Sequence, residues 1–302
     1  MQEFYQELCN NIDKQYILTE EPMFKHTTFR VGGGAEYYIK IQNEEMLKSA
    51  CTICKKHKVN YFVLGNGSNL LVGDKGIRGV VLEIGNGMNK IQIQGNTLVA
   101  QAGALLSRVG KMALDAKLAG FEFAAGIPGT IGGAVVMNAG AYGGEMKDIV
   151  TQVKVLNKDG EIQVLEAKDM EFRYRHSAII EKEAIVLEVT VELEAGESEA
   201  IKARMDELKV QRITKQPLEY GSAGSTFKRP EGYFAGKLIQ DAGLRGFQVG
   251  GAQVAEKHCG FVINKKNATA NDIAELMRQV SQKVEEEFGV KLEPEVKRVG
   301  DF

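Results

Sequence analysis

Three glycine-rich loops, spread between Val31 and Gly144, constrain the fold of this chain more than any other feature. They are Val31-Gly32-Gly33-Gly34, Gly65-Asn66-Gly67-Ser68-Asn69, and a long segment that begins at Gly126. Glycine loses more backbone entropy on folding than any other residue, so such a density requires a compensation elsewhere. We expect the backbone in these loops to approach a ligand or another segment of the chain closely.

The second loop, Gly65–Asn69, follows the apolar run Tyr61 to Leu64, which is typical of a strand. Its glycines allow backbone N–H groups to converge on an anion, with Ser and Asn donors nearby. It is not a Rossmann fingerprint, because Leu70 stands at the third glycine position, and no G-x-x-x-x-G-K-[ST] sequence occurs. The loop is therefore either a phosphate cradle or a tight surface turn. The segment Gly126–Gly133 is either the site of a flat cofactor or a glycine-rich packing corner.

Composition narrows the class of protein. The chain has 302 residues, of which 44% are hydrophobic and 26% charged, so a globular protein of about two domains is expected. A net charge of −2 without a basic block argues against nucleic acid as a partner. Met1 to Asn11 is typical of an amphipathic helix rather than a signal peptide, and the uncharged run Phe123 to Gly144 is too rich in glycine for a membrane helix. We therefore expect no membrane partner. Four cysteines are too few for the disulfide framework of a secreted protein, so we expect a cytoplasmic protein.

Hydrophobic periodicity predicts an α+β fold in which antiparallel pairs and helices are mixed. Gly95-Asn96 is a two-residue turn that predicts a hairpin. Gln216-Pro217, after a helix, indicates a domain boundary near residue 206. The predicted strands are 37–41, 61–64, 80–84, 91–94, 97–101, 150–156, 162–165, 184–193 and 290–299, and the predicted helices are 1–11, 43–58, 104–116, 198–212 and 271–288.

A hydroxyl group beside cations marks the C-terminal part of the chain. Ser225 lies next to a glycine, and Lys228 and Arg229 follow closely, as the binding of an anionic substrate requires. Ser225 lacks a G-x-S-x-G elbow and is not expected to be a hydrolase nucleophile. It is either a proton donor or an ordinary turn or cap residue.

Three further groups have less specific patterns. Tyr174-Arg175 belongs either to a binding site or to a surface ion pair, and Glu293-Pro294-Glu295 to a site or to a solvated strand start. Cys51 and Cys54 with His57 have partial metal spacing but no second ligand pair, so core and surface positions of a helix are expected and no metal is predicted.

Taken in order, these motifs resemble the flavin-dependent UDP-N-acetylenolpyruvoylglucosamine reductases of bacterial peptidoglycan synthesis. The resemblance covers essentially the whole chain. A single one of these motifs would not be specific for the family, whereas seven of them in the family's order are. The motifs are His26-Thr27-Thr28-Phe29-Arg30-Val31-Gly32-Gly33, Leu64-Gly65-Asn66-Gly67-Ser68-Asn69-Leu70, Gly126-Ile127-Pro128-Gly129, Asn138-Ala139-Gly140-Ala141-Tyr142, Tyr174-Arg175-x-Ser177, Ala223-Gly224-Ser225-x-Phe227-Lys228 and Leu292-Glu293-Pro294-Glu295-Val296.

The resemblance implies a vanillyl-alcohol-oxidase-like (PCMH-type) FAD-binding unit of two α+β subdomains, followed by a smaller α+β substrate domain. The FAD-binding region would comprise residues 1–205, with subdomains of about 1–88 and 89–205, and the substrate domain residues 206–302. FAD would be bound non-covalently, since neither glycine segment contains a histidine that could tether it. The implied FAD-binding residues are Gly65, Asn66, Gly67, Ser68, Asn69, Gly126, Ile127, Pro128, Gly129, Gly132 and Gly133.

The resemblance also implies the reaction. NADPH would reduce FAD and leave, and the enolpyruvyl ether of UDP-N-acetylglucosamine would then be reduced to the lactyl ether of UDP-N-acetylmuramate. Arg175 and Glu295 would stabilise the charge that develops towards the carboxylate, and Ser225 would donate a proton. The implied substrate contacts are Tyr174, Lys215, Lys228, Arg229 and Lys297. The chain resembles the shorter, second type of the family, and we expect a monomer.

Two other functions remain open from the sequence. A related flavin oxidase would share the cofactor fold and pass electrons to oxygen. A non-catalytic flavin-binding or nucleotide-binding protein would leave Arg175, Ser225 and Glu295 without a role.

Overall fold

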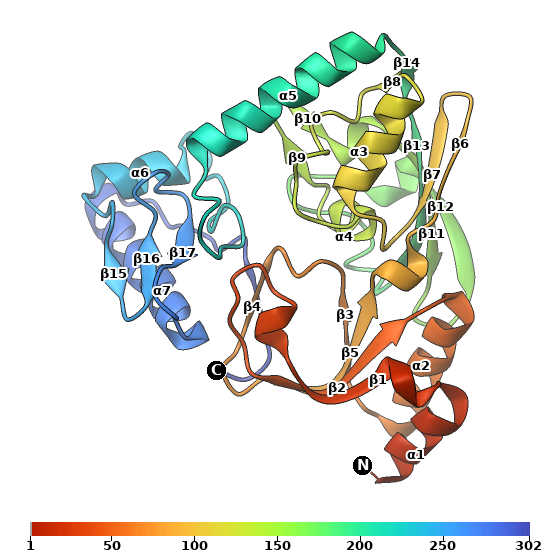
Figure 1. Cartoon of the computed structure of the whole chain (residues 1–302). Coiled ribbons are helices and arrows are strands. Elements are labelled where there is room, and N and C mark those ends of the chain that lie inside the picture. The colour runs from red at the N-terminus through yellow and green to blue at the C-terminus, as the bar shows by residue number, and fades with distance from the viewer. Residues whose placement is uncertain (1) are drawn as a thin grey trace. The chain divides into compact units, whose positions relative to one another are not determined.

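The computed structural model describes residues 2–302, and the chain divides into two compact units that both contain helices and strands (Figure 1). Unit 1 comprises the described residues up to Leu18, together with Tyr38–Asn66 and Val80–Gln211. Unit 2 comprises Thr19–Tyr37, Gly67–Gly79 and Arg212–Phe302. The α+β class predicted from the sequence is confirmed.

An antiparallel sheet of unit 1 has the strand order β12-β11-β13-β7-β6. The predicted hairpin is confirmed, because β6 pairs with β7 and Gly95 takes a left-handed φ of 60° at the turn. Helix α4 packs on β13 and β7. The bounds are β6 (Ile91–Gln94), β7 (Thr97–Gln101), α3 (Leu106–Asp115), α4 (Ile131–Val136), β11 (Val150–Leu156), β12 (Ile162–Glu166) and β13 (Ile185–Glu192).

A four-stranded sheet has the order β1-β2-β5-β3, in which β3 is parallel to β5. Helix α2 begins as predicted, since the side chain of Asn43 accepts a hydrogen bond from Met46 N at 2.8 Å. Helix α1 packs against α2, and Met1, which the predicted first helix included, lies outside the described residues. The bounds are α1 (Gln2–Asn11), β1 (Ile17–Pro22), β2 (Gly34–Ile41), α2 (Glu44–His57), β3 (Tyr61–Leu64) and β5 (Ile77–Ile84).

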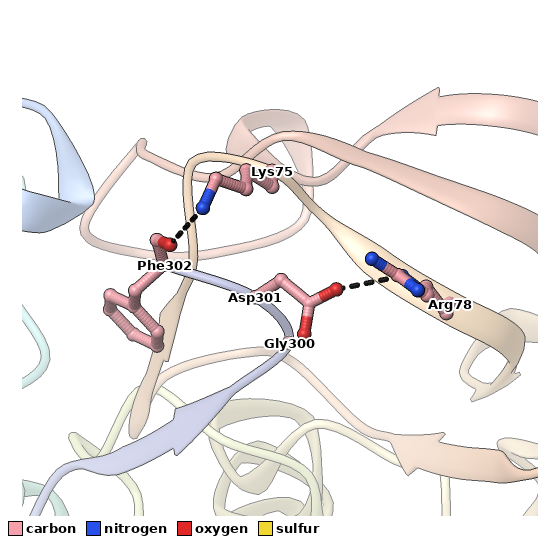
Figure 2. A pocket seen from close by; sticks show the side chains of 5 residues that line it. All are labelled: Lys75, Arg78, Gly300, Asp301 and Phe302. Atoms are coloured by element: carbon pink, nitrogen blue, oxygen red, sulfur yellow. Dashed lines mark hydrogen bonds and ion pairs between the residues drawn. The ribbon is translucent and has the colours of Figure 1, made fainter.

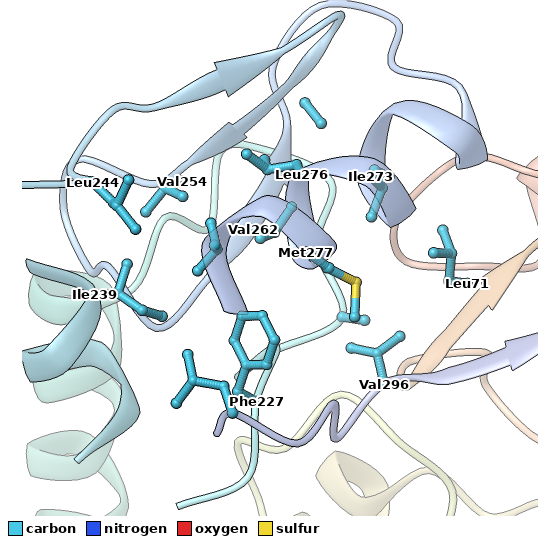
Figure 3. Packing of buried hydrophobic residues seen from close by; sticks show 14 of the residues in the cluster. Leu71, Phe227, Ile239, Leu244, Val254, Val262, Ile273, Leu276, Met277 and Val296 are labelled. Atoms are coloured by element: carbon cyan, nitrogen blue, oxygen red, sulfur yellow. The ribbon is translucent and has the colours of Figure 1, made fainter. Parts of the chain in front are cut away.

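Unit 2 is built around helix α7 and an antiparallel sheet of order β15-β16-β17. Figure 3 shows Leu276 and Met277 of α7 packed with Phe227, Ile239 and other apolar side chains into one core. As predicted, Gly289 ends α7 in the left-handed conformation, with a φ of 67°. The bounds are α6 (Ala235–Asp241), β15 (Gln248–Val249), β16 (Ala252–Val254), β17 (Val262–Asn264) and α7 (Ala270–Phe288).

Strand β18 (Lys297–Val299) pairs in parallel with β4 (Leu70–Val72), also in unit 2. The predicted strand 290–299 was wrong except for these last residues. Pro294 has no N–H group to donate to a ladder, and Glu295 N instead donates to Thr226 O.

An open pocket of about 400 Å³ lies next to β18 (Figure 2). Its cations are paired within the pocket, because Lys75 Nζ donates to Phe302 O at 2.7 Å and Arg78 Nε lies 2.8 Å from a carboxylate oxygen of Asp301. These contacts fasten residues 300–302 to the chain that follows β4.

Helix α5 (Ser198–Lys215) is continuous through residue 206, where the sequence predicted a domain boundary. The division into residues 1–205 and 206–302 stays a prediction. The shorter elements are the strands β8 (Leu118–Ala119), β9 (Gly140–Ala141), β10 (Gly144–Glu145) and β14 (Glu194–Ala195) and the 3₁₀ helices Lys14–Tyr16, Met23–Lys25, Asn86–Met88, Met146–Asp148 and Ala167–Met170. Among the helices of the described residues, none is both long enough and apolar enough to cross a membrane.

Candidate active site

The two glycine segments of unit 1 meet each other. Asn66 Nδ2 donates to the carbonyl oxygen of Pro128 at 3.4 Å. A Cβ placed on Gly65 would lie only 2.6 Å from the hydroxyl of Thr130, so glycine is needed at this contact. The start of the loop Gly65–Asn69 therefore packs against the segment that leads into α4.

In the second segment, one part is a packing corner and another part is accessible to a ligand. Gly132 is a packing residue, because its Cβ would lie 2.7 Å from Ala102 Cβ and its N–H donates to the Ala102 carbonyl at 2.9 Å. Thr130 caps α4, with its hydroxyl accepting from Gly133 N at 3.4 Å. The candidate residues Gly126, Ile127, Pro128 and Gly129 form the turns before α4 and are exposed or half-buried.

The rest of the loop, Gly67 to Asn69, belongs to unit 2. Gly67 has a φ of 60°, and a Cβ there would collide with the carbonyl oxygen of His26. The Gly67 carbonyl accepts a hydrogen bond from Thr28 N at 3.2 Å. Only glycine fits this close approach of two backbones.

A buried hydroxyl supports the binding of a ligand at this loop. Thr28 Oγ1 is inaccessible to water and has no hydrogen-bond partner among the described residues, although buried hydroxyls are normally paired. It belongs to the residue whose amide holds Gly67. A free hydroxyl donor beside a glycine-rich turn fits the diphosphate of FAD, which supplies acceptors only.

The first glycine cluster has a structural role. Gly33 N donates to Gly73 O at 3.0 Å, and a Cβ on Gly33 would lie 2.6 Å from Gly76 N. Here the close approach expected from the sequence is to another segment of the chain.

Ser225 and Glu295 lie on neighbouring segments of unit 2. Glu295 N donates to the carbonyl of Thr226 at 2.9 Å, and Phe227 forms a bridge with Pro294. Thr226 is fully buried and fixed on its other side, since its hydroxyl accepts from Val262 N at 2.8 Å. Ser225 is exposed and Glu295 is half-buried, so a rigid backbone presents both side chains.

Several candidate cations of unit 2 gather around these segments. Lys228 N donates to Glu293 O at 2.8 Å, and Lys228 Nζ pairs with the Glu293 carboxylate at 3.2 Å. The Arg229 guanidinium lies 4.0 Å from the centre of the Phe234 ring. Lys297 N donates to Asn69 O at 3.0 Å.

Asn69 joins the candidate FAD loop to the segment that carries Glu295. Its Nδ2 donates to the carbonyl of Glu295 at 3.1 Å. Lys215, which the resemblance adds to the substrate contacts, is exposed at the last position of α5.

Tyr174 and Arg175 belong to unit 1. The Arg175 guanidinium lies 4.9 Å from the centre of the Tyr174 ring, which is a cation–π contact. Tyr174 is 48% exposed, so its ring is open to a ligand. The convergence of Arg175 with Ser225 and Glu295 stays a prediction.

Cys51 and Cys54 have the properties of core residues. Burial raises the pKa of Cys51 to about 11 and that of Cys54 to about 12, which makes reactive thiolates scarce. His57 lies 2.7 Å from a carboxylate oxygen of Glu7. Within residues 2–302, no three or more His, Cys, Asp or Glu side chains are grouped so that they could hold a metal ion.

The sequence indicated no role for three residues beside the candidate site residues, namely Thr28 in unit 2 and Asn138 and Ser177 in unit 1. Each of them belongs to one of the motifs that carry the family resemblance, and that membership was the only feature of the sequence that pointed to these residues. Asn138 is 1% exposed and donates to the carbonyl of Arg173, while Ser177 is fully buried and its hydroxyl donates to the carbonyl of Val136.

Comparison with known proteins identifies the family. A family model described as UDP-N-acetylenolpyruvoylglucosamine reductase, C-terminal domain, matches residues 216–299, and a model described as FAD binding domain matches residues 35–166. The UDP-N-acetylenolpyruvoylglucosamine reductase of Clostridioides difficile (strain 630) is 51% identical over 300 residues, covering 99% of each chain.

Solved structures agree with this assignment. The crystal structure of UDP-N-acetylenolpyruvylglucosamine reductase from Thermus caldophilus matches with a TM-score of 0.81 and 36% identity, covering 94% of this chain and 98% of that one. Phl p 4.0202, a glucose dehydrogenase, matches with a TM-score of 0.51 and 18% identity over 70% of this chain and 50% of its own, which shows a shared fold only. The predicted vanillyl-alcohol-oxidase-like fold is confirmed. The chain contains an FAD-binding domain and belongs to the UDP-N-acetylenolpyruvoylglucosamine reductase family.

Proposed function

We propose that this chain is an NADPH-dependent flavoenzyme that reduces UDP-N-acetylglucosamine enolpyruvate to UDP-N-acetylmuramate, a step in the synthesis of peptidoglycan precursors. The names of relatives that match along the whole chain support this reaction. The observation that carries it is the hydrogen bond from Glu295 N to Thr226 O, which brings an exposed serine and a carboxyl group from distant segments onto one rigid frame.

The glycine loops would hold FAD without a covalent bond. Backbone N–H groups of Gly65 to Asn69 and the hydroxyl of Thr28 would bind its diphosphate, and the segment Gly126–Gly133 would lie against its flat ring and adenosine. Bound FAD would supply the hydride chemistry, taking electrons from NADPH and passing them to the methylene carbon of the substrate.

Ser225 would supply the proton. Hydride addition to the methylene carbon leaves an electron pair on the adjacent carbon, and transfer of the Ser225 hydroxyl proton to that carbon completes the reduction. A serine hydroxyl is a weak acid at neutral pH, so it can serve only when positioned against a strongly basic carbon in a site from which water is excluded.

Arg175 and Glu295 would stabilise the negative charge that spreads into the substrate carboxylate. A guanidinium group can bind both carboxylate oxygens at once. A carboxyl group can donate a hydrogen bond there only while it holds a proton, so this role requires the acid form of Glu295. The amide Glu295→Gln also donates and is therefore expected to retain more activity than Glu295→Ala.

Cations and one aromatic ring would bind the uridine diphosphate. Positive side chains and an open Tyr174 ring suit a ligand that combines two phosphates with a flat base. Alanine substitutions among them are expected to raise KM more than they lower kcat. The set comprises Tyr174, Lys215, Lys228, Arg229 and Lys297.

The deciding experiment separates the two half-reactions. The purified protein should be yellow, release its flavin on denaturation, and be bleached by NADPH under anaerobic conditions. Ser225→Ala should still bind flavin and be bleached by NADPH, while kcat for the enolpyruvyl substrate falls about 10²–10⁴-fold, the range for loss of a general acid. Ser222→Ala, three positions away, is the matched control and should behave like the wild type.

Other outcomes point to the alternatives. Reoxidation of the reduced protein by air that is faster than reoxidation by UDP-N-acetylglucosamine enolpyruvate would indicate a flavin oxidase. Flavin binding without turnover would indicate a binding protein. Unchanged turnover in Ser225→Ala would remove this serine from the mechanism.

The protein would be a cytoplasmic monomer that binds no nucleic acid, consistent with its net charge of −2. Residues 1–205, with subdomains of about 1–88 and 89–205, would form the FAD-binding region and residues 206–302 the substrate domain, a division supported by the two family-model matches at 35–166 and 216–299.

A further inference from the structure

Arg175 lies at the tip of a tight turn that is conformationally demanding. Arg173 and His176 exchange two backbone hydrogen bonds, of 3.2 and 3.1 Å, so Tyr174 and Arg175 are the two central residues. Arg175 has a φ of 55°, a left-handed conformation that is costly for residues other than glycine. Such a conformation persists only where the surroundings hold it.

Asn138 anchors the first end of this turn. Its side chain is 1% exposed and uses both N–H groups, donating to Arg173 O at 3.1 Å and to Glu145 Oε2 at 2.8 Å. Its Oδ1 accepts from Lys147 N at 2.9 Å. Asn138 itself has a φ of 43°, which asparagine tolerates better than most residues.

Ser177 anchors the other end. It is fully buried, and its hydroxyl donates to the carbonyl oxygen of Val136 at 2.8 Å. The turn 173–177 is therefore held at both ends by residues 136–138, at the C-terminal end of α4, a few residues after the segment Gly126–Gly133 that is proposed to contact flavin.

The charges around the first anchor are balanced. Lys147 Nζ lies 2.8 Å from Glu145 Oε2. The hydrogen bond from Lys147, with smaller contributions from Asn138 and the positive charge of Arg175, lowers the pKa of Glu145. The carboxylate that Asn138 binds thus stays ionised at neutral pH, which favours a fixed orientation of the amide.

We propose that Asn138 and Ser177 are positioning residues that clamp the turn 173–177 and so fix the Arg175 guanidinium where it binds the carboxylate of the enolpyruvyl substrate. This inference rests on the proposed function of Arg175. The clamp also links the placement of Arg175 to the segment after α4, so one rigid piece of unit 1 carries both.

The test compares Asn138→Ala and Ser177→Ala with Glu181→Gln. Glu181 touches the exposed outer side of the same turn, 3.1 Å from His176 Nε2, and is the matched control. Both clamp variants are expected to lower kcat for the enolpyruvyl substrate about 10²-fold, the effect of a misplacement of about 1 Å. The rate of flavin bleaching by NADPH should stay unchanged, and Glu181→Gln should match the wild type in both half-reactions.

Two further measurements separate positioning from stability. In an Arg175→Ala background, adding Asn138→Ala should cost far less than it does in the wild type, because the residue it positions is absent. Calorimetric titration of the oxidised, flavin-loaded proteins with the substrate in the absence of NADPH should show weaker binding for both clamp variants. If Asn138→Ala does not fold, Ser177→Ala carries the same test from the other anchor.

The overturning results are specific. If Asn138→Ala lowers kcat by the same factor in the Arg175→Ala background as in the wild type, its role is a general structural one and the inference is refuted. The same holds if the clamp variants slow flavin bleaching by NADPH as much as they slow reduction of the enolpyruvyl substrate. Wild-type protein that does not reduce the enolpyruvyl substrate at all would refute the proposed function, and the clamp proposal with it.

Discussion

Replacing Gly67 by alanine tests whether the loop Gly65–Asn69 depends on the close approach of two backbones. Gly67 has a φ of 60°. A Cβ there would collide with the His26 carbonyl oxygen and lie 3.0 Å from the carbonyl carbon and 3.1 Å from Thr27 Cα. Gly95 has the same φ of 60° but nothing within 4 Å of a Cβ, so Gly95→Ala is a matched control.

The two variants differ only in the collision. The left-handed conformation costs a residue other than glycine about 1–2 kcal/mol, which both variants should lose. Gly67→Ala adds the cost of overpacking, about 1–3 kcal/mol. If this loop binds the diphosphate of FAD as proposed, displacing it would also remove hydrogen bonds to a charged group, each worth about 1.5–3 kcal/mol, so the Kd for FAD should rise at least about tenfold.

Urea unfolding of the flavin-free proteins measures the first effect, and quenching of flavin fluorescence on binding measures the second. Gly95→Ala should show the smaller loss of stability and bind FAD like the wild type. Equal unfolding midpoints for the two variants together with an unchanged Kd for FAD would refute the reasoning, since the contact with His26 would then have no energetic consequence.

Three further predictions concern the scaffold. Asp74→Ala removes the carboxylate that accepts two first-turn N–H groups of α7, at 2.7 and 3.0 Å, and should lower the free energy of unfolding by about 1–2 kcal/mol in urea denaturation. Hydrogen bonds from Arg278 lower the pKa of Glu275 from 4.5 to about 2. The pKa of Glu275 is thus lower in the folded than in the unfolded protein, so its stabilisation is complete above about pH 4.5 and is lost as the pH falls towards 2. An NMR titration should find this low pKa, and Arg278→Ala should return the pKa to its ordinary range. Cys51 and Cys54 should resist alkylation in the folded protein at pH 8 and react after denaturation, as read by mass spectrometry, because burial raises their pKa.

Elements set by their own residues could be predicted from the sequence, whereas elements set by distant contacts could not. The cap at Asn43, the turn at Gly95 and the stop at Gly289 act locally, and the corresponding helices and hairpin formed as predicted. Helix α4 lies in a glycine-rich segment of low helix propensity and was missed, because packing on β13 and β7 and the cap at Thr130 stabilise it.

The same distinction holds for the candidate site. Motif order indicated Ser225 and Glu295, but their proximity depends on a backbone contact between segments far apart in the sequence, which periodicity does not encode. The clamp on Arg175 was missed for a similar reason. Asn138 looked like one more polar residue in a glycine-rich stretch, and its role follows only from the three partners that the fold brings to it.

Strand β4 is synthesised long before β18, the strand with which it pairs. Asn69 and Glu295, which precede the paired strands, are 226 residues apart in the chain. A ribosome that adds about 5–20 residues per second needs roughly 10–45 seconds for that distance. Throughout this interval the backbone groups of Leu70–Val72 lack their β18 partners, and unpaired strand edges of this kind can pair with other chains and cause aggregation. Translation speed and chaperone supply should therefore influence the yield of this protein more than that of one whose early strands pair with their immediate neighbours.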